Sequence, residues 1–118
     1  MTYIPDHGDL VFLEFDPQAG HEQIGKRPAL VVSNKTFNQF TKLTMVCPIT
    51  NTQRNYPLHV TLDSRTKTTG VIMCEQVKSL DLNARKATFF ERIPDDILAE
   101  VLDILNGFIE IEEDKGTV

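Results

Sequence analysis

Residues 20–28 form a polar loop whose side chains are suited to binding a phosphate. Two glycines let its backbone bend, Glu22 lies inside it, and the adjacent cations Lys26 and Arg27 come near its end. Pro28 removes a backbone donor and biases Arg27 towards an extended conformation, directly before an apolar run. We therefore expect Arg27 at the mouth of a strand, where its planar guanidinium can donate two parallel hydrogen bonds to a phosphate. An ordinary hairpin loop with a surface ion pair fits the local residues about as well.

A second polar segment begins with Thr50, two residues after Pro48. The Thr50 hydroxyl can hydrogen-bond a phosphate oxygen or a reacting hydroxyl. A threonine in such a context more commonly bonds its own backbone within a turn. Thr50 by itself is therefore a weak indication of a functional site.

The formal net charge of −5 conceals an uneven distribution of charge along the chain. Residues 1–25 hold five acids and no lysine or arginine, residues 26–92 hold eleven basic residues and four acids, and residues 93–118 hold eight acids and one lysine. A basic middle can present a positive face to a polyanion even in an acidic protein. The alternative is that these cations are spread over every solvated face.

The length of 118 residues favours a single domain, spanning 1–118, with one hydrophobic core. No apolar run approaches the roughly 20 residues that span a membrane, and the N-terminus is not typical of a secretory signal. The histidines are scattered, and Cys47 and Cys74 lie in apolar stretches without CxxC spacing. We therefore expect no metal, no cofactor, buried reduced thiols and a cytoplasmic location.

The elements that must position the polar segments are mostly short strands. Because no long helix separates these strands, they favour an antiparallel sheet or barrel over βαβ units. Short helical turns are expected at 34–40 and 81–85. The runs with the composition or alternation of strands are residues 10–15, 29–32, 43–47 (ended by Pro48), 58–62, 70–77 (bent at its middle) and 87–90.

The chain closes with an amphipathic helix that begins near Pro94, with two aspartates at its positive end. Apolar residues then recur at helical spacing up to Ile109, and this stripe is expected to face the core, with a share facing a second subunit. An Asn-Gly pair weakens the last turn, which favours Phe108 and later residues leaving the helix. Residues 109–118 are expected to form an acidic, flexible, solubilising tail; the alternative is a tail that folds over a basic groove.

Four blocks stand in an order and at spacings typical of one family. They are Gly8-Asp9-Leu10, Glu22-Gln23-Ile24-Gly25-Lys26-Arg27-Pro28, Pro48-Ile49-Thr50 and Glu75-Gln76-Val77-Lys78-Ser79-Leu80. With these blocks the chain resembles the MazF/PemK family of toxin endoribonucleases over about residues 3–109. The second block carries the most specific part of the resemblance.

The resemblance implies an α+β, mostly β fold: an SH3-like antiparallel barrel with short helices and a C-terminal helix, paired as a homodimer. It implies cleavage of single-stranded messenger RNA at short motifs without a metal. The RNA's own 2′-hydroxyl would attack, leaving 2′,3′-cyclic phosphate and 5′-hydroxyl ends. The family's catalytic arginine falls on Arg27, its catalytic threonine on Thr50 and its loop glutamate on Glu22. A cognate antitoxin would lay an acidic-hydrophobic C-terminal segment into the same groove, and the toxin–antitoxin pair would bind DNA to regulate its own expression.

The chemistry of these groups divides their roles. Arginine does not readily lose its proton, so we expect Arg27, buried in a closed loop, to stabilise charge on the non-bridging oxygens. One preorganised donor of this kind is worth roughly 2.7–4 kcal/mol. Help from Arg27 as a general acid to the leaving 5′-oxygen stays open. Glu22 is a candidate base. His21 departs from the family pattern and, because histidine titrates near neutral pH, is a second candidate, with an exposed loop histidine of no consequence as the alternative.

Further RNA contacts are expected from cations, amides and aromatic rings, since single-stranded RNA is bound through phosphates, base edges and stacking. A non-catalytic toxin of the same fold that binds DNA gyrase and a plain RNA-binding module are the rival functions. The presence of both Arg27 and Thr50 argues against the first rival, because a binder does not need the pair. The expected phosphate contacts are Lys26, Arg54, Lys78 and Arg85; the base-reading amides are Gln23, Asn51, Gln53 and Gln76; and the stacking or packing rings are Phe37, Phe40 and Tyr56.

Overall fold

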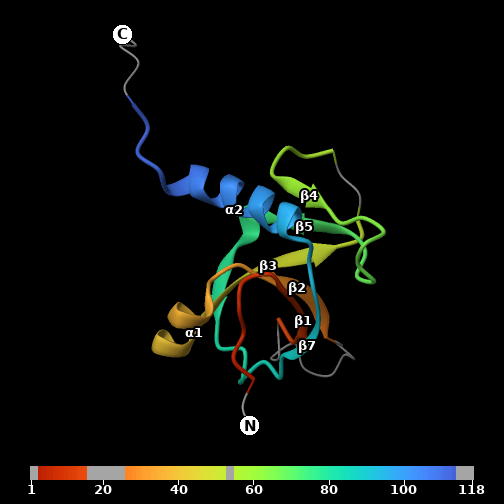
Figure 1. Cartoon of the computed structure of the whole chain (residues 1–118), viewed down its shortest axis with the longest axis vertical. Coiled ribbons are helices and arrows are strands. Elements are labelled where there is room, and N and C mark those ends of the chain that lie inside the picture. Colours follow the sequence, from red (N-terminus) through yellow and green to blue (C-terminus); the bar gives the residue numbers. More distant parts are fainter. Residues whose placement is uncertain (1–2, 16–25, 53–54, 114–118) are drawn as a thin grey trace.

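The computed structural model describes residues 3–15, 26–52 and 55–113. Over these residues an antiparallel sheet with the order β4-β5-β3-β2-β1-β7 is flanked by two α-helices, and β6 pairs with β3 outside that path (Figure 1). This arrangement confirms the predicted α+β, mostly β fold class. The elements are β1 (Asp9–Leu13), β2 (Arg27–Val31), α1 (Lys35–Thr41), β3 (Thr44–Thr50), β4 (His59–Thr61), β5 (Val71–Met73), the 3-10 helix η1 (Cys74–Gln76), β6 (Lys78–Leu80), β7 (Thr88–Arg92) and α2 (Asp95–Ile109).

Strand β3 is the organising strand of the sheet. One of its edges pairs with β2, whereas its other edge pairs first with β6, over residues 44–46, and then with β5, over residues 49–50. The prediction that Pro48 ends this strand is wrong, because β3 continues to Thr50. Pro48 lacks a backbone N–H, and it falls in the gap where that edge changes partner from β6 to β5, where a missing donor is tolerated.

Apolar side chains form two buried clusters. The larger cluster includes Leu30, Cys47 and Ile72, and α2 closes it by burying Ile97, Leu98 and Val101. The smaller cluster lies around Val11, Val31 and Val46. The apolar stripe of the C-terminal helix therefore faces the core, as predicted.

The end of α2 differs from the prediction. The helix continues through the Asn106-Gly107 pair to Ile109, and the Glu110 N–H still donates to the Asn106 carbonyl at 3.1 Å. A glycine inside a helix costs only about 1 kcal/mol relative to alanine, which is too little to end a helix whose backbone ladder is otherwise intact. No described helix is long and apolar enough to cross a membrane.

The predicted short turns are present. Asn34 caps α1 by accepting a hydrogen bond from the Phe37 N–H at 2.9 Å. Within 81–85, the Arg85 N–H donates to the Asp81 carbonyl at 3.2 Å and closes a single helical turn. The bend expected within 70–77 corresponds to η1, which separates β5 from β6.

Buried Asp9 explains the first of the four family-like blocks. Its carboxylate accepts hydrogen bonds from the Tyr3 hydroxyl at 2.6 Å and from the Arg92 guanidinium at 2.8 Å, and so ties β1 to β7 and to the N-terminal segment. Gly8 has a φ of +94°, and a Cβ there would lie 2.8 Å from Arg92 Nη2. A glycine is therefore required beside this ion pair.

Candidate functional site

The sheet register places Arg27 and Thr50 on facing strands. In the β2–β3 ladder Ala29 pairs with Pro48 and Leu30 with Cys47, so the residue numbers of each pair add up to 77. Arg27 and Thr50 belong to these same neighbouring strands, but the ladder ends at the pair Ala29–Pro48, two positions before either residue.

Thr50 stabilises a local turn through its side-chain oxygen and keeps its hydroxyl proton available to a ligand. Its Oγ1 accepts a hydrogen bond from the Thr52 N–H at 3.2 Å. The alternative expected from the sequence, a threonine that bonds its own backbone, is thus part of the structure. Because Oγ1 acts there as an acceptor, its own O–H remains able to donate to a ligand.

Gly70, directly before β5, supports the backbone of Thr50. Its φ is +116°, and a Cβ built there would lie 2.4 Å from the Thr50 carbonyl oxygen and 3.1 Å from Asn51 Oδ1. Asn51 in turn accepts a hydrogen bond from the Thr69 hydroxyl at 2.9 Å. Close backbone packing that only glycine permits therefore holds the end of β3 in place.

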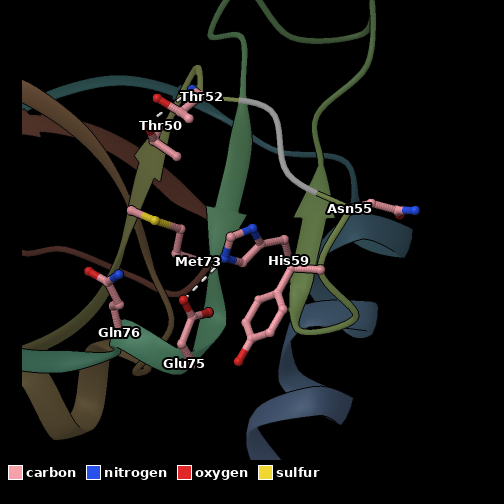
Figure 2. A pocket seen from close by; sticks show the side chains of 8 residues that line it. Thr50, Thr52, Asn55, His59, Met73, Glu75 and Gln76 are labelled. Carbon is pink, nitrogen blue, oxygen red and sulfur yellow. Dashed lines mark hydrogen bonds and ion pairs between the residues drawn. The ribbon is translucent and has the colours of Figure 1, made fainter.

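Thr50 lies at the edge of a polar cavity of about 590 Å³ (Figure 2). A cavity of this size can hold a small ligand or part of a larger one. It is formed between the end of β3, the segment before β4, and the β5–η1 junction. The described residues that line it are Thr50, Thr52, Asn55, Tyr56, His59, Met73, Glu75 and Gln76.

A histidine–glutamate pair forms one wall of this cavity, and the sequence prediction did not include it. His59 Nε2 lies 3.1 Å from Glu75 Oε2 (Figure 2), the His59 side chain is only 6% exposed, and the Glu75 side chain is 27% exposed. Tyr56 packs edge-on against the imidazole at a centroid distance of 4.9 Å. The pairing of β4 with β5, which puts His59 opposite Met73, brings His59 towards Glu75. The sequence does not reveal this strand pairing, and His59 and Glu75 taken singly resemble ordinary strand and turn residues, so their contact was not predicted.

Other sequence-predicted site residues are spread around this region. Gln76 and Tyr56 line the cavity. Lys26 is exposed just before β2, Arg27 is the exposed first residue of β2, and the ammonium of Lys78 lies 5.5 Å from the centroid of the Phe15 ring. Arg27 is therefore exposed and accessible to a ligand, whereas the sequence had led us to expect it buried in a closed loop.

Among the described residues, the predicted RNA contacts that do not line the cavity are Lys26, Phe37, Phe40, Asn51, Lys78 and Arg85. Phe37 and Phe40 belong to α1, where Phe40 is 87% exposed. The guanidinium of Arg85 donates to the backbone carbonyls of Glu14 and Phe15. Arg85 therefore ties the 81–85 turn to the segment just after β1, and its assignment as a phosphate contact stays a prediction. The predicted site residues His21, Glu22, Gln23, Gln53 and Arg54 lie outside the described residues.

The two cysteines lie next to the site in the core. Both are free and buried, and the β3–β5 register, in which Ile49 pairs with Ile72, places Cys47 opposite Cys74. A hydrogen bond to Cys74 and burial raise the pKa of the Cys47 thiol far above its usual value. The expectation of buried cysteines is confirmed. Among the described residues no group of three or more His, Cys, Asp or Glu side chains is placed to hold a metal ion.

The family model of the PemK-like, MazF-like toxin of type II toxin-antitoxin systems matches residues 6–109. The chain belongs to this family. Among curated relatives of this PemK/MazF-family chain, Endoribonuclease PemK of Escherichia coli is 40% identical over 108 residues, covering 88% of this chain and 81% of that protein. Endoribonuclease toxin MazF of Escherichia coli K12 is 42% identical over 86 residues, covering 73% and 77%.

Solved structures agree with the family assignment. The crystal structure of MazF from Deinococcus radiodurans superposes with a TM-score of 0.80 at 44% identity, covering 92% of this chain and 98% of that one. A crystal structure of MazE-MazF from the same organism superposes with a TM-score of 0.81 at 36% identity, covering 94% and 100%. The fold of this PemK/MazF-family chain is therefore that of MazF.

Proposed function

We propose that this chain, an endoribonuclease of the PemK/MazF toxin family, cleaves single-stranded messenger RNA at specific short motifs without a metal ion. The RNA's 2′-hydroxyl loses its proton to a base and attacks the adjacent phosphorus, the bond from phosphorus to the 5′-oxygen breaks, and the leaving 5′-oxygen takes up a proton. The products carry a 2′,3′-cyclic phosphate and a 5′-hydroxyl. The placement of Arg27 on β2 and of Thr50 on the adjacent strand β3 carries this proposal, because it would give one phosphate two donors from neighbouring strands.

In this mechanism Arg27 is an electrostatic clamp. Attack at phosphorus accumulates negative charge on the non-bridging oxygens, and a guanidinium can meet two of them with parallel hydrogen bonds. Arg27 does not serve as the base, because its proton is not readily lost. The Thr50 hydroxyl donates a further hydrogen bond that fixes the phosphate, while its oxygen stays held by the Thr52 N–H.

The proton of the attacking hydroxyl goes to a group in the loop before β2. We propose Glu22 as the base, with His21 as the competing candidate, since a carboxylate or an imidazole accepts a proton far more readily than a guanidinium does. The loop that carries both residues leads directly into Arg27 at the start of β2.

RNA on either side of the cleaved phosphate is proposed to lie over the cavity and the adjoining surface. The amides that would read base edges are Gln23, Asn51, Gln53 and Gln76, and the cations that would contact phosphates are Lys26, Arg54 and Lys78. The support is that Gln76 lines the cavity that Thr50 borders, and that Lys26 precedes Arg27 directly.

The proposed partner in the cell is a cognate antitoxin whose acidic-hydrophobic C-terminal segment covers Arg27. The support is the family assignment and the likeness to the MazE-MazF structure from Deinococcus radiodurans. A cytoplasmic location follows from this proposal, because messenger RNA is the target.

We further propose that the chain acts as a homodimer that pairs through α2. An apolar groove of about 720 Å³ runs between α2 and the side chains of Val32, Met45 and Val77, and Ile109 at its end is 81% exposed. Exposed apolar surface of this kind is typical of an interface. Ile109→Glu is expected to shift the molar mass in light scattering from dimer to monomer. Ile111→Glu, at a residue that is 95% exposed and outside the groove lining, is the matched control and should leave a dimer.

The decisive experiment incubates purified protein with a long single-stranded RNA in EDTA and maps the ends. Discrete cuts with 2′,3′-cyclic phosphate ends are expected, and Arg27→Ala should remove them. Arg65→Ala is the matched control, because that exposed arginine contacts Asp63 and Asp96 and does not line the cavity. Intact RNA with the parent protein, or cleavage by Arg27→Ala within about threefold of the parent rate, contradicts the proposal.

A further inference from the structure

The His59–Glu75 pair holds a carboxylate in a defined place on the cavity wall. An ionised carboxylate is only an acceptor, so the proton in the 3.1 Å contact belongs to His59 Nε2. The other ring nitrogen, Nδ1, is buried without a hydrogen-bond partner among the described residues. The contact therefore runs from the His59 Nε2–H donor to the Glu75 carboxylate.

His59 is fixed in this orientation by its surroundings. It lies on β4 opposite Met73, its side chain is 6% exposed, and Tyr56 packs against its ring. Glu75 is less constrained, since its side chain is 27% exposed and lines the cavity. The buried imidazole thus restrains the carboxylate at one oxygen, while both carboxylate oxygens keep lone pairs that can accept from a ligand.

The chemistry of that carboxylate selects what binds beside it. A phosphate is repelled, so this wall of the cavity suits a base rather than the RNA backbone. Guanine offers N1–H and N2–H donors side by side on its Watson–Crick edge, which match the two oxygens of a carboxylate. Uracil offers one N–H flanked by two carbonyl oxygens, and those oxygens would face the carboxylate.

We propose that Glu75 determines sequence specificity by accepting hydrogen bonds from the Watson–Crick edge of a guanine next to the cleaved phosphate, and that His59 is the positioning residue that holds it there. This inference rests on the proposed cleavage of RNA, because Thr50 borders the same cavity. Tyr56, which is 44% exposed and lines the cavity, supplies a ring on which that base can stack.

Cleavage of an RNA library randomised over eight positions tests the proposal. The parent protein is expected to require guanine at one position of its motif, with a preference of about 10–100-fold, as for a good bidentate base contact. Glu75→Gln replaces one acceptor by a donor. It should lower the preference for guanine at least tenfold, chiefly by raising KM for the guanine-containing RNA. His59→Gln can place an amide N–H near the position of Nε2 and should retain the preference, whereas the shorter His59→Asn should lose it.

Binding separates this inference from the proposed catalysis and does not depend on the Glu75 variants folding. Arg27→Ala protein, with His59 and Glu75 intact, is titrated with two oligonucleotides of the selected motif that carry guanine or inosine, which lacks the N2 amino group. At least tenfold weaker binding of the inosine RNA supports the inference. Equal binding of the two RNAs, or a library motif without guanine, overturns it. Loss of all cleavage in Glu75→Gln with unchanged base preference in binding also overturns it, because the carboxylate would then act in the chemistry.

Discussion

Replacing Gly70 with alanine is expected to damage the site through the backbone of Thr50. Gly70 has a φ of +116°, a conformation that costs a residue with a Cβ about 1–3 kcal/mol. The new Cβ would also lie 2.4 Å from the Thr50 carbonyl oxygen, whereas ordinary contacts begin at 3.4 Å. One of the two strands must therefore move by about 1 Å, the difference between these distances.

Two separate effects follow from that movement. The free energy of unfolding should fall by about 2–6 kcal/mol, because conformational strain and overpacking each contribute about 1–3 kcal/mol. The rate of RNA cleavage per folded molecule should fall by up to about 100-fold, since a displacement of 1 Å in a catalytic arrangement has an effect of that size.

Urea unfolding and single-turnover cleavage, measured on the folded fraction, check both effects. Gly107→Ala is the matched control, because it makes the same substitution in α2, where no described atom lies within 4 Å of the new Cβ. It should stabilise the protein by about 0.5–1 kcal/mol and leave cleavage unchanged. A Gly70→Ala protein with the parent's urea midpoint and cleavage rate would refute the argument.

Two further predictions concern titration and the thiols. Partial burial raises the pKa of Glu91, but hydrogen bonds from the Thr68 and Lys67 N–H groups and the Thr68 hydroxyl outweigh it, so the pKa lies below its ordinary value of 4.5. The stabilisation that results is present above pH 4.5 and is lost as the pH falls below that value. Glu91→Gln should therefore flatten the decline of stability below pH 4.5 in acid titrations followed by circular dichroism. An unchanged slope of stability against pH would contradict this prediction. Cys47 and Cys74 should react with a thiol reagent only as fast as the protein opens, because both are buried and the pKa of Cys47 is raised; rapid reaction of either thiol in the native protein would contradict this.

Local patterns in the sequence were sufficient to predict the strand-rich fold and the closing helix. Alternation in 58–62 predicted β4, and helical spacing after Pro94 predicted α2. The predictions failed where tertiary context outweighs local preference. Pro48 does not end β3 because the strand changes partner there, and Gly107 does not end α2 because the backbone ladder of the helix continues.

The candidate site was predictable only in part, because its geometry depends on register. Arg27 and Thr50 were predicted from residue type and family resemblance, whereas their placement on neighbouring strands depends on the β2–β3 pairing. His59 was missed because its contact with Glu75 depends on the pairing of β4 with β5, and no local pattern encodes that pairing. Arginine is a residue type that often contacts phosphate, but residue type alone did not reveal that the Arg85 guanidinium donates hydrogen bonds to the backbone carbonyls of Glu14 and Phe15, just after β1.

The most direct test of the central claim, that Arg27 and Thr50 act on one phosphate, is a double-mutant cycle on single-turnover RNA cleavage. Thr50→Val removes the hydroxyl but keeps the branched shape that suits β3. Groups that act as a unit are strongly non-additive, so the double variant should be no more than a few-fold slower than Arg27→Ala alone. A double variant whose loss equals the product of the two single losses would contradict the account, because the residues would then act independently.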